Sequence, residues 1–297
     1  MSNGVTSLSI DLALGHFDLL PDETRAQLPR PLPTERAVSL YGQDVHYYET
    51  GEGPEVILLH GLGGEAANWT ANIGPISKNY HVYALDQIGF GRSAKPLIEY
   101  RIQTFVDFLE AFMQELNIPK ATLIGSSLGG WIAADFTAQH GNLVNKLVLV
   151  DASGLAPLGP RFRNLPPDLG AGSVSGTHKV FELIFHGKGF VTEELVKRAF
   201  VHKMRRGDGY TQQRTLTGIL LNNQFVDKKL GNIRAPTLII WGRSDRLTDL
   251  SLGERFKKGI LGAKLTVLDE CGHVPHVERP EQFNKIVLDF LALPASA

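Results

Sequence analysis

Residues 121–135 have the sequence ATLIGSSLGGWIAAD. The first four form a short apolar run that is typical of a buried strand, and the residues from Leu128 onward are typical of an apolar helix. Between them, residues 125–129 (GSSLG) fit the pattern G-x-S-x-G. When this pattern lies between a strand and a helix, it presents a serine hydroxyl beyond the edge of a sheet. Ser127 is the candidate nucleophile because, unlike Ser126, it has glycines two residues before and two residues after it.

Further short apolar runs lie on both sides of this segment, and their continuous apolar character predicts strands buried on both faces. These runs cover residues 56–59, 82–85, 147–150 and 238–241, with an earlier strand expected at 45–49 and a last one at 265–268. Helical patterns occupy residues 104–116, 128–139 and 280–291. Alternating strands and helices predict an α/β fold, a doubly wound and mostly parallel sheet.

The alternation stops between residues 153 and 230. No buried-strand run occurs there, and helical patterns at 179–185 and 192–204 dominate instead. Glycine and proline are frequent at both limits of the stretch, for example in residues 154–167. We therefore expect residues 153–230 to be a helical cap inserted between two strands of the core.

The remaining chain divides into a core and an N-terminal arm. Of the 297 residues, 37–152 and 231–297 are assigned to the α/β core. Residues 1–36 are expected to be a lead-in arm, with a short helix over residues 21–28 that has proline in its first turn. Most of the length beyond a single sheet domain is therefore accounted for by the cap.

The composition narrows the class of protein. Apolar residues make up 43% and charged residues 21%, as in an ordinary globular protein. Lys and Arg total 30 against 31 Asp and Glu, so no global positive field favours binding to nucleic acid. Cys271 is the single cysteine, which excludes an internal disulfide and predicts a cytoplasmic protein. No apolar stretch is long enough to predict a membrane span.

A serine nucleophile needs a base, and the base needs an orienting acid. Asp245 follows the apolar run at 238–241 in the sequence WGRSD, and His273 follows the run at 265–268 in ECGH. Because ligand sites in open α/β sheets lie at the carboxyl ends of the strands, these side chains are expected to converge on Ser127.

Taken together, these motifs resemble the α/β-hydrolase family over roughly residue 38 to the C-terminus. The matching segments are HGLGG at 60–64, DQIGFGRS at 86–93, GSSLGG at 125–130, GRSD at 242–245 and CGH at 271–273. The resemblance implies a triad of Ser127, His273 and Asp245, with the backbone N–H groups of Leu62 and Leu128 binding the oxyanion. Candidate pocket residues are Gly61, Phe90, Ser126, Trp131 and Val274.

Other residues near these motifs have competing interpretations. Asp249 and Asp151 are rival acids to Asp245, which directly follows the loop WGRS and matches the family position. His60 lies too early for the family's base and is expected to pack its loop, while Asp86 is expected to shape a turn. Phe90 and Trp131 are equally interpretable as plain core, and Cys271 as a buried spectator.

No metal or cofactor is expected. His273 and His276 form an H-x-x-H pair, but Pro275 disfavours the helix that such chelation requires, and no third ligand is evident. The glycine-rich loops lack the lysine or downstream acid that nucleotide and dinucleotide sites need. The expected partner is therefore a small-molecule substrate.

The motifs predict hydrolysis of carboxylic esters of small to medium, largely apolar substrates through an acyl-enzyme. The alternative is carbon–carbon bond hydrolysis of ring-cleavage dienoic acids, by resemblance in length, elbow and CGH ending. Three departures from those enzymes disfavour it: HGLGGE in place of an HGxGPG-type loop, Ser126 in place of asparagine, and Val274 in place of tryptophan. A cofactor-free perhydrolase or lyase on the same triad, and a non-catalytic binding protein, remain open.

Overall fold

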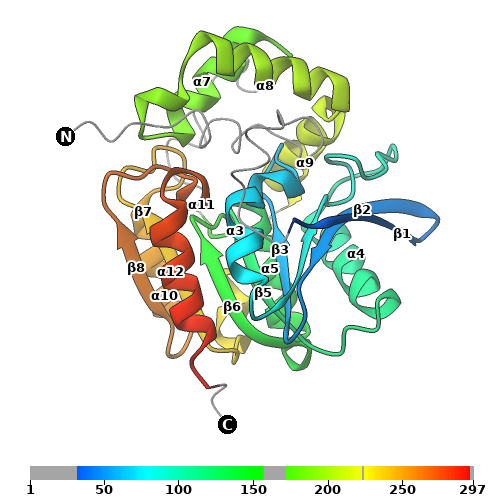
Figure 1. Cartoon of the computed structure of the whole chain (residues 1–297), viewed down its shortest axis with the longest axis vertical. Helices are drawn as coiled ribbons and strands as arrows, with labels where there is room; N and C mark the ends of the chain where they lie inside the picture. Colours follow the sequence, from blue (N-terminus) through cyan, green and yellow to red (C-terminus); the bar gives the residue numbers. More distant parts are fainter. Residues whose placement is uncertain (1–31, 157–171, 223, 295–297) are drawn as a thin grey trace.

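The computed structural model describes residues 32–156, 172–222 and 224–294. Its centre is an eight-stranded sheet with the order β1-β2-β4-β3-β5-β6-β7-β8 (Figure 1). The strands are β1 (Thr34–Leu40), β2 (Gln43–Thr50), β3 (Glu55–Leu59), β4 (His81–Leu85), β5 (Ala121–Ser126), β6 (Val144–Val150), β7 (Thr237–Gly242) and β8 (Lys264–Leu268). The β1–β2 and β2–β4 pairs are antiparallel, and the others are parallel. The predicted doubly wound, mostly parallel α/β sheet is confirmed.

The central strands are apolar throughout because both of their faces are buried. In β3, Ile57 and Leu59 enter one hydrophobic core, while Val56 and Leu58 enter a second core on the opposite face. The same alternation continues through β5, β6 and β7. Since successive side chains of a strand point to opposite faces, a continuous apolar run is the pattern that a sheet covered on both sides requires.

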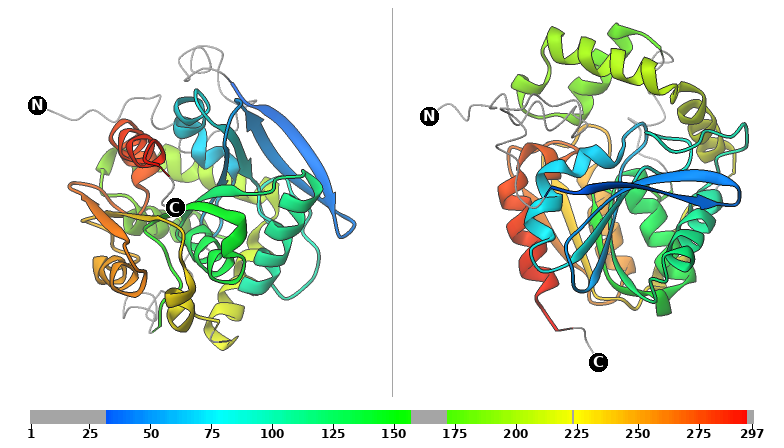
Figure 2. Two further views of the ribbon diagram at one scale, coloured as in Figure 1. Left: turned by 90° about the horizontal axis from the view of Figure 1, so that it is seen from below. Right: turned by 45° about the vertical axis from the view of Figure 1, so that its right-hand side comes forward.

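Helices cover the two faces of the sheet (Figure 2). One core includes side chains of α4 (Ile102–Glu115), α5 (Leu128–Gln139) and α10 (Leu250–Gly259). The other includes side chains of α3 (Thr70–Ile76) and α12 (Pro280–Leu291), which pack against each other. The bounds of α5 and α12 are the predicted ones, and α4 begins two residues before its predicted start.

Three α-helices stand between β6 and β7 in the described chain: α7 (Val174–Ile184), α8 (Glu193–Arg206) and α9 (Gly209–Asn222). Figure 1 shows α7 and α8 above the sheet, at the end where the parallel strands finish. A separate hydrophobic cluster lies here. It contains Phe181, Phe185, Phe190, Leu195 and Val196, together with Val277 from the short helix α11 (Pro275–Glu278). Helix α9 has no counterpart among the predicted elements.

The N-terminal edge differs from the expectation. Strand β1 begins at Thr34, so residues 34–36, assigned to the arm, lie in the sheet. The strand is mostly exposed and carries polar side chains, so it lacks the apolar pattern by which the other strands are found. The helix expected at 21–28 lies outside the described residues. Among the described helices, none has the length and apolar character needed to span a membrane.

Two glycines allow β5, α5 and β3 to approach one another closely. A methyl group placed on Gly129 would lie 2.2 Å from the carbonyl oxygen of Leu59 in β3. One placed on Gly125 would lie 2.2 Å from the carbonyl oxygen of Gly129. Both contacts are with backbone, which cannot rotate away, so the close approach of helix and sheet depends on the absence of side chains here.

The substitution Gly129→Ala is expected to lower the free energy of unfolding by about 2 kcal/mol or more, because the added methyl group must push α5 away from β3. Gly141→Ala is the control, since nothing lies within 4 Å of a methyl group at that position. It is expected to change stability by less than about 0.5 kcal/mol. Chemical denaturation measures both values, and equal stability of the two variants would contradict the packing argument.

Candidate active site

Ser127 lies at the sharp turn between β5 and α5. Its backbone has φ 52° and ψ −113°, a conformation that side-chain-bearing residues seldom adopt. The turn is held by hydrogen bonds from Ser127 N to Val150 O (2.9 Å) and from Ser153 N to Ser127 O (3.0 Å). The strained backbone is therefore held by residues in and just after the neighbouring strand β6. The G-x-S-x-G motif predicts the sharp strand-to-helix turn itself.

The loop after β3 packs directly against this serine. A methyl group on Gly61 would lie 3.2 Å from Ser127 Cβ, so the backbone that leads into Leu62 passes next to the side chain. On the other side, Leu128 is the first residue of α5, and its backbone N–H has no acceptor within the helix. Backbone N–H groups in such positions are suited to binding a developing oxyanion.

His60 fixes the loop that contains Gly61 and Leu62. The imidazole is fully buried, and its Nε2 accepts a hydrogen bond from Gln87 N at 3.0 Å. Nδ1 lies 2.8 Å from Gly61 O and is the donor, since Nε2 already accepts. Burial lowers the pKa of His60, which favours this neutral form. The geometry agrees with the packing role predicted for His60.

Asp245 and His273 form a buried pair. His273 Nδ1 donates to Asp245 Oδ2 at 2.7 Å, and the two residues are 3% and 6% exposed. Asp245 also accepts hydrogen bonds from the backbone N–H of Leu247 (2.7 Å) and from the Thr248 hydroxyl (2.5 Å). Burial acts to raise the pKa of Asp245, but His273 and these donors hold it below its ordinary value.

The second ring nitrogen of His273 is available for proton transfer. Its Nε2 atom is buried and has no hydrogen-bond partner among the described residues. Ser127 and His273 are therefore not hydrogen bonded in this structure, although both lie beyond the carboxyl ends of parallel strands. Catalytic hydrogen bonds often tighten only when the substrate is bound. Because Nδ1 donates a hydrogen bond to Asp245, Nε2 is the ring atom that can accept a proton from a nucleophile.

The two rival acids occupy other positions. Asp249 is the N-cap of α10, and its side chain accepts a hydrogen bond from Ser251 N at 2.9 Å. Asp151, directly after β6, does contact the pair, because its polar atoms lie within 4.8 Å of those of Asp245 and His273. It does not hydrogen bond to the imidazole. Asp245 is thus the acid that orients His273.

Three residues of the site have the atom types of metal ligands, and a hydrogen bond joins two of them. Asp151, Asp245 and His273 offer ligand atoms that are close together, but His273 Nδ1 bonds directly to Asp245 Oδ2. The two histidines of the H-x-x-H pair lie in different surroundings. The His276 ring stacks on Trp69, with the ring centroids 4.2 Å apart. Burial lowers the pKa of His276 to about 3, so this ring stays neutral and takes part in core packing.

The predicted pocket residues are placed in different surroundings. Phe90 is fully buried, with its ring centroid 5.6 Å from that of His60, and Trp131 is fully buried and stacked on Phe225 at 5.4 Å. These contacts agree with the interpretation of both rings as core. Ser126 is also buried at the end of β5, whereas Val274 packs against the hydrophobic cluster of α7 and α8.

Cys271 is fully buried near the base. Burial raises the pKa of its thiol, which disfavours the thiolate that acts as a nucleophile. This environment agrees with the predicted spectator role.

Glu278 is a residue of the site that sequence reasoning missed. Its carboxylate accepts hydrogen bonds from the backbone N–H groups of Gly272 (2.8 Å), His186 (2.8 Å) and Gly187 (3.0 Å). Next to it, the His273 backbone N–H donates to Ile184 O at 2.7 Å. The loop that carries the base is thus attached to the end of α7. No local motif signals the contact with His186 and Gly187, because these residues lie about 90 positions before Glu278 in the chain.

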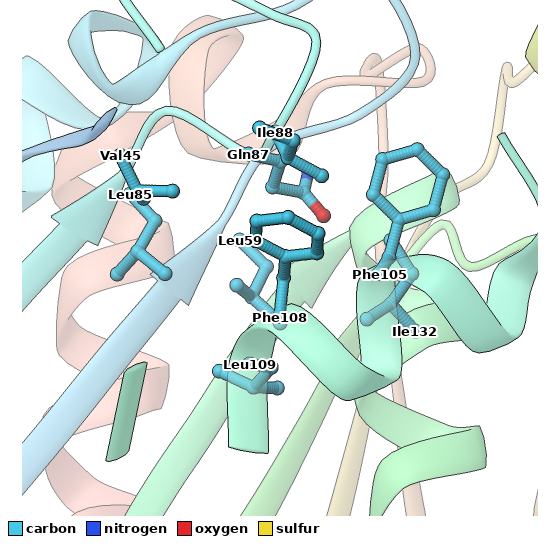
Figure 3. Close-up of a pocket in the computed structure, with 9 residues that line it drawn as sticks. All are labelled: Val45, Leu59, Leu85, Gln87, Ile88, Phe105, Phe108, Leu109 and Ile132. Carbon is cyan, nitrogen blue, oxygen red and sulfur yellow. The ribbon is translucent and has the colours of Figure 1, made fainter. Parts of the chain in front are cut away.

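A small, partly open cavity lies elsewhere, against the face of the sheet covered by α4 (Figure 3). It is lined by Val45, Leu59, Leu85, Gln87, Ile88, Phe105, Phe108, Leu109 and Ile132. Gln87 is its one polar lining residue, and the Gln87 amide is held by the carbonyl oxygen of His60 at 2.7 Å. The cavity is not the candidate site, since it is lined by none of Ser127, Asp245 and His273.

Comparison with known proteins identifies the family to which this chain belongs. The family model described as alpha/beta hydrolase fold matches residues 54–280. The chain belongs to the alpha/beta hydrolase fold family.

Two curated relatives and two solved structures illustrate the similarity. The chain is 30% identical over 262 residues to the 2-hydroxy-6-oxo-6-phenylhexa-2,4-dienoate hydrolase of Comamonas testosteroni, covering 83% of this chain and 91% of the relative. It is 31% identical to 2-hydroxy-6-oxononadienedioate/2-hydroxy-6-oxononatrienedioate hydrolase 1 of Pseudomonas putida, covering 84% and 92%. A meta-cleavage product hydrolase, CumD, superimposes with TM-score 0.78 at 28% identity, covering 86% and 97%. A membrane phospholipase A superimposes with TM-score 0.76 at 28% identity, covering 87% and 86%.

Replacing Glu278 by glutamine tests the link between the base loop and α7. Burial raises the pKa of Glu278, and its backbone donors act in the opposite direction. A glutamine NH₂ group would face at least one backbone N–H, leaving a buried donor unsatisfied. Glu278→Gln is therefore expected to lower the free energy of unfolding by about 2 kcal/mol and to reduce turnover.

Glu254→Gln, on the exposed side of α10, is the matched control and is expected to match the wild type in both measurements. Thermal or chemical denaturation gives the stability. A Glu278→Gln protein as stable and active as the control would show that this carboxylate does not hold the loop.

Proposed function

We propose that the chain is a serine hydrolase in which Ser127, His273 and Asp245 cleave a carbon–carbon bond of a 2-hydroxy-6-oxo-dienoate. The observation that carries the hydrolytic chemistry is the buried 2.7 Å bond between Asp245 and His273, which leaves Nε2 without a partner among the described residues. The relatives support the class of substrate, because several of them are named as hydrolases of such dienoates.

The names of these substrates define the bond that is broken. They contain a ketone at carbon 6 and no ester or amide, so the addition of water has to split a bond between carbons. Cleavage next to carbon 6 leaves an electron pair on carbon 5. That pair is stabilised when the 2-hydroxy-diene has first become the 2-oxo tautomer, because the C3=C4 double bond then conjugates carbon 5 with the C2 carbonyl.

The site residues perform the steps in a defined order. His273 Nε2 accepts the proton of Ser127, whose oxygen attacks carbon 6, and the N–H groups of Leu62 and Leu128 bind the resulting oxyanion. The C5–C6 bond then breaks, and the imidazolium returns the proton to the dienolate. An acyl-enzyme is left on Ser127. Water, activated by His273, hydrolyses it to the second acid and restores the enzyme, while Asp245 stabilises the imidazolium throughout.

The ester hydrolysis preferred from the sequence is not supported by the curated relatives, which favour the carbon–carbon alternative. Three local departures, at Ser126, at Val274 and in the loop HGLGGE, disfavour the carbon–carbon reaction, but similarity over 83% and 84% of the chain outweighs them. Ester hydrolysis stays as the second candidate because the phospholipase A shares 28% identity and a TM-score of 0.76. Both reactions begin with the same attack of a serine on a carbonyl carbon.

The cap, residues 153–230, is proposed to set the specificity of the site. Two contacts with the loop after β3, which contains Leu62, support this assignment. The side chain of Gln212 in α9 lies 3.3 Å from where a methyl group on Gly63 would be. His202 in α8 pairs with Glu65 at 2.9 Å. Helices of the cap are thereby attached close to Leu62, where they can select the group that approaches the serine.

Labelling with a fluorophosphonate tests the nucleophile. Wild-type protein and Ser126→Ala are expected to form a covalent adduct, and Ser127→Ala is expected to form none, because the reagent reacts with an activated serine hydroxyl. Intact-protein mass spectrometry measures the adduct. Labelling that persists in Ser127→Ala, or disappears in Ser126→Ala alone, would overturn the assignment.

Substrate preference tests the class of bond. The ratio kcat/KM is expected to be at least about a hundredfold higher for 2-hydroxy-6-oxo-6-phenylhexa-2,4-dienoate than for p-nitrophenyl butyrate, about 2.7 kcal/mol in barrier. Both reactions are followed by absorbance with the same enzyme preparation. The opposite preference would establish the ester reaction instead, while loss of both activities in Ser127→Ala would show that they share one site.

A further inference from the structure

Asp151 is a buried acid that the proposed mechanism does not use. It follows β6, has φ 42° and is fully buried. Its backbone N–H donates to Ile240 O at 3.0 Å, and its Oδ1 accepts from Gly242 N at 2.9 Å. These contacts with β7 fix the position of the buried side chain.

The other oxygen of Asp151 has no donor. Nothing among the described residues donates to Asp151 Oδ2, and the carboxyl group of Asp245 lies close by, with oxygens of the two groups within 4.8 Å of each other. Two buried carboxylates in contact repel each other when both are ionised, and neither can donate a hydrogen bond. One proton between them removes both problems.

The proton belongs on Asp151 because of how the two groups are solvated. The ionised form of Asp245 is stabilised by His273, Leu247 and Thr248, all of which donate to it. Among the described residues, the Asp151 carboxyl group has one donor, the backbone N–H of Gly242. The group with fewer donors is the one that is harder to ionise in a buried site.

We infer that Asp151 is a neutral carboxylic acid whose O–H donates to Asp245, which makes it a positioning residue for the Asp245–His273 pair. The inference rests on the proposed role of that pair. Burial, and then the charge of Asp245, raise the pKa of Asp151 well above its ordinary value, in the direction that this requires. Glu278 also faces Asp151 and acts in the same direction.

A neutral Asp151 leaves a single negative charge next to His273, that of Asp245. An ionised Asp151 would place a second carboxylate in the same buried cluster, where like charges repel each other. Asp151 therefore contributes a hydrogen bond to Asp245 without contributing charge.

Infrared difference spectroscopy of the free enzyme at neutral pH tests the protonation state directly. Asp151→Asn is expected to remove the carbonyl band of a protonated carboxylic acid. Asp269→Asn, which replaces an exposed aspartate paired with Arg243, is expected to remove only carboxylate bands. Loss of carboxylate bands alone in Asp151→Asn would overturn the inference. No substrate is needed, so the result is independent of which bond the enzyme hydrolyses.

A pair of substitutions tests the positioning role. An asparagine at 151 can still accept from Gly242 N and donate to Asp245, whereas alanine can do neither. On the substrate that the wild type prefers, Asp151→Asn is expected to keep at least tenfold more kcat/KM than Asp151→Ala. Equal losses in the two variants would overturn the role. Melting curves verify that both variants fold, and if the alanine variant does not, the infrared comparison decides.

Discussion

The rest of the structure depends on the strained backbone at Ser127. Holding a serine at φ 52° costs about 1–3 kcal/mol, which the surrounding structure has to offset. The hydrogen bonds to Val150 and from Ser153 do so from one side, and the close packing of α5 on β3 does so from the other. The turn can form only where Gly125 and Gly129 leave room for backbone. The position of the hydroxyl is thus set by the sheet, and not by a flexible loop.

The parallel register of β5 to β8 brings distant polar groups to the same edge. Each of these strands is followed by a side chain of the site, and neighbouring strands end close together. Ser127, Asp151, Asp245 and His273 therefore lie at one edge of the sheet although they span almost 150 residues. The same convergence buries two acids in contact. The protonation state of each acid then depends on the hydrogen-bond donors around it. Several donors stabilise the ionised form of Asp245, whereas Asp151 has fewer among the described residues.

Much of this arrangement is predictable from local sequence. The apolar runs predict the central strands, and the helical periodicity predicts α5 and α12. The positions of polar residues after the strands predict Asp245 and His273 as site residues. What is missed has no local pattern. Strand β1 is polar and exposed, and it forms by pairing with β2. Glu278 acts through backbone N–H groups far along the chain, and the relation of Asp151 to Asp245 exists only once β6 and β7 are paired.

The motifs indicate hydrolysis more clearly than they indicate whether the hydrolysed bond is an ester bond or a carbon–carbon bond. Serine attack, oxyanion binding and proton return require identical groups for an ester and for a ketone. The two reactions differ in the leaving group: an alkoxide is stabilised by the proton of His273, whereas a carbanion also needs conjugation within the substrate. That requirement is met by the chemistry of the substrate. The groups that the two reactions share lie in motifs that local sequence identifies, whereas the selection of a substrate depends on contacts between distant segments, such as those that Gln212 and His202 make with the loop after β3.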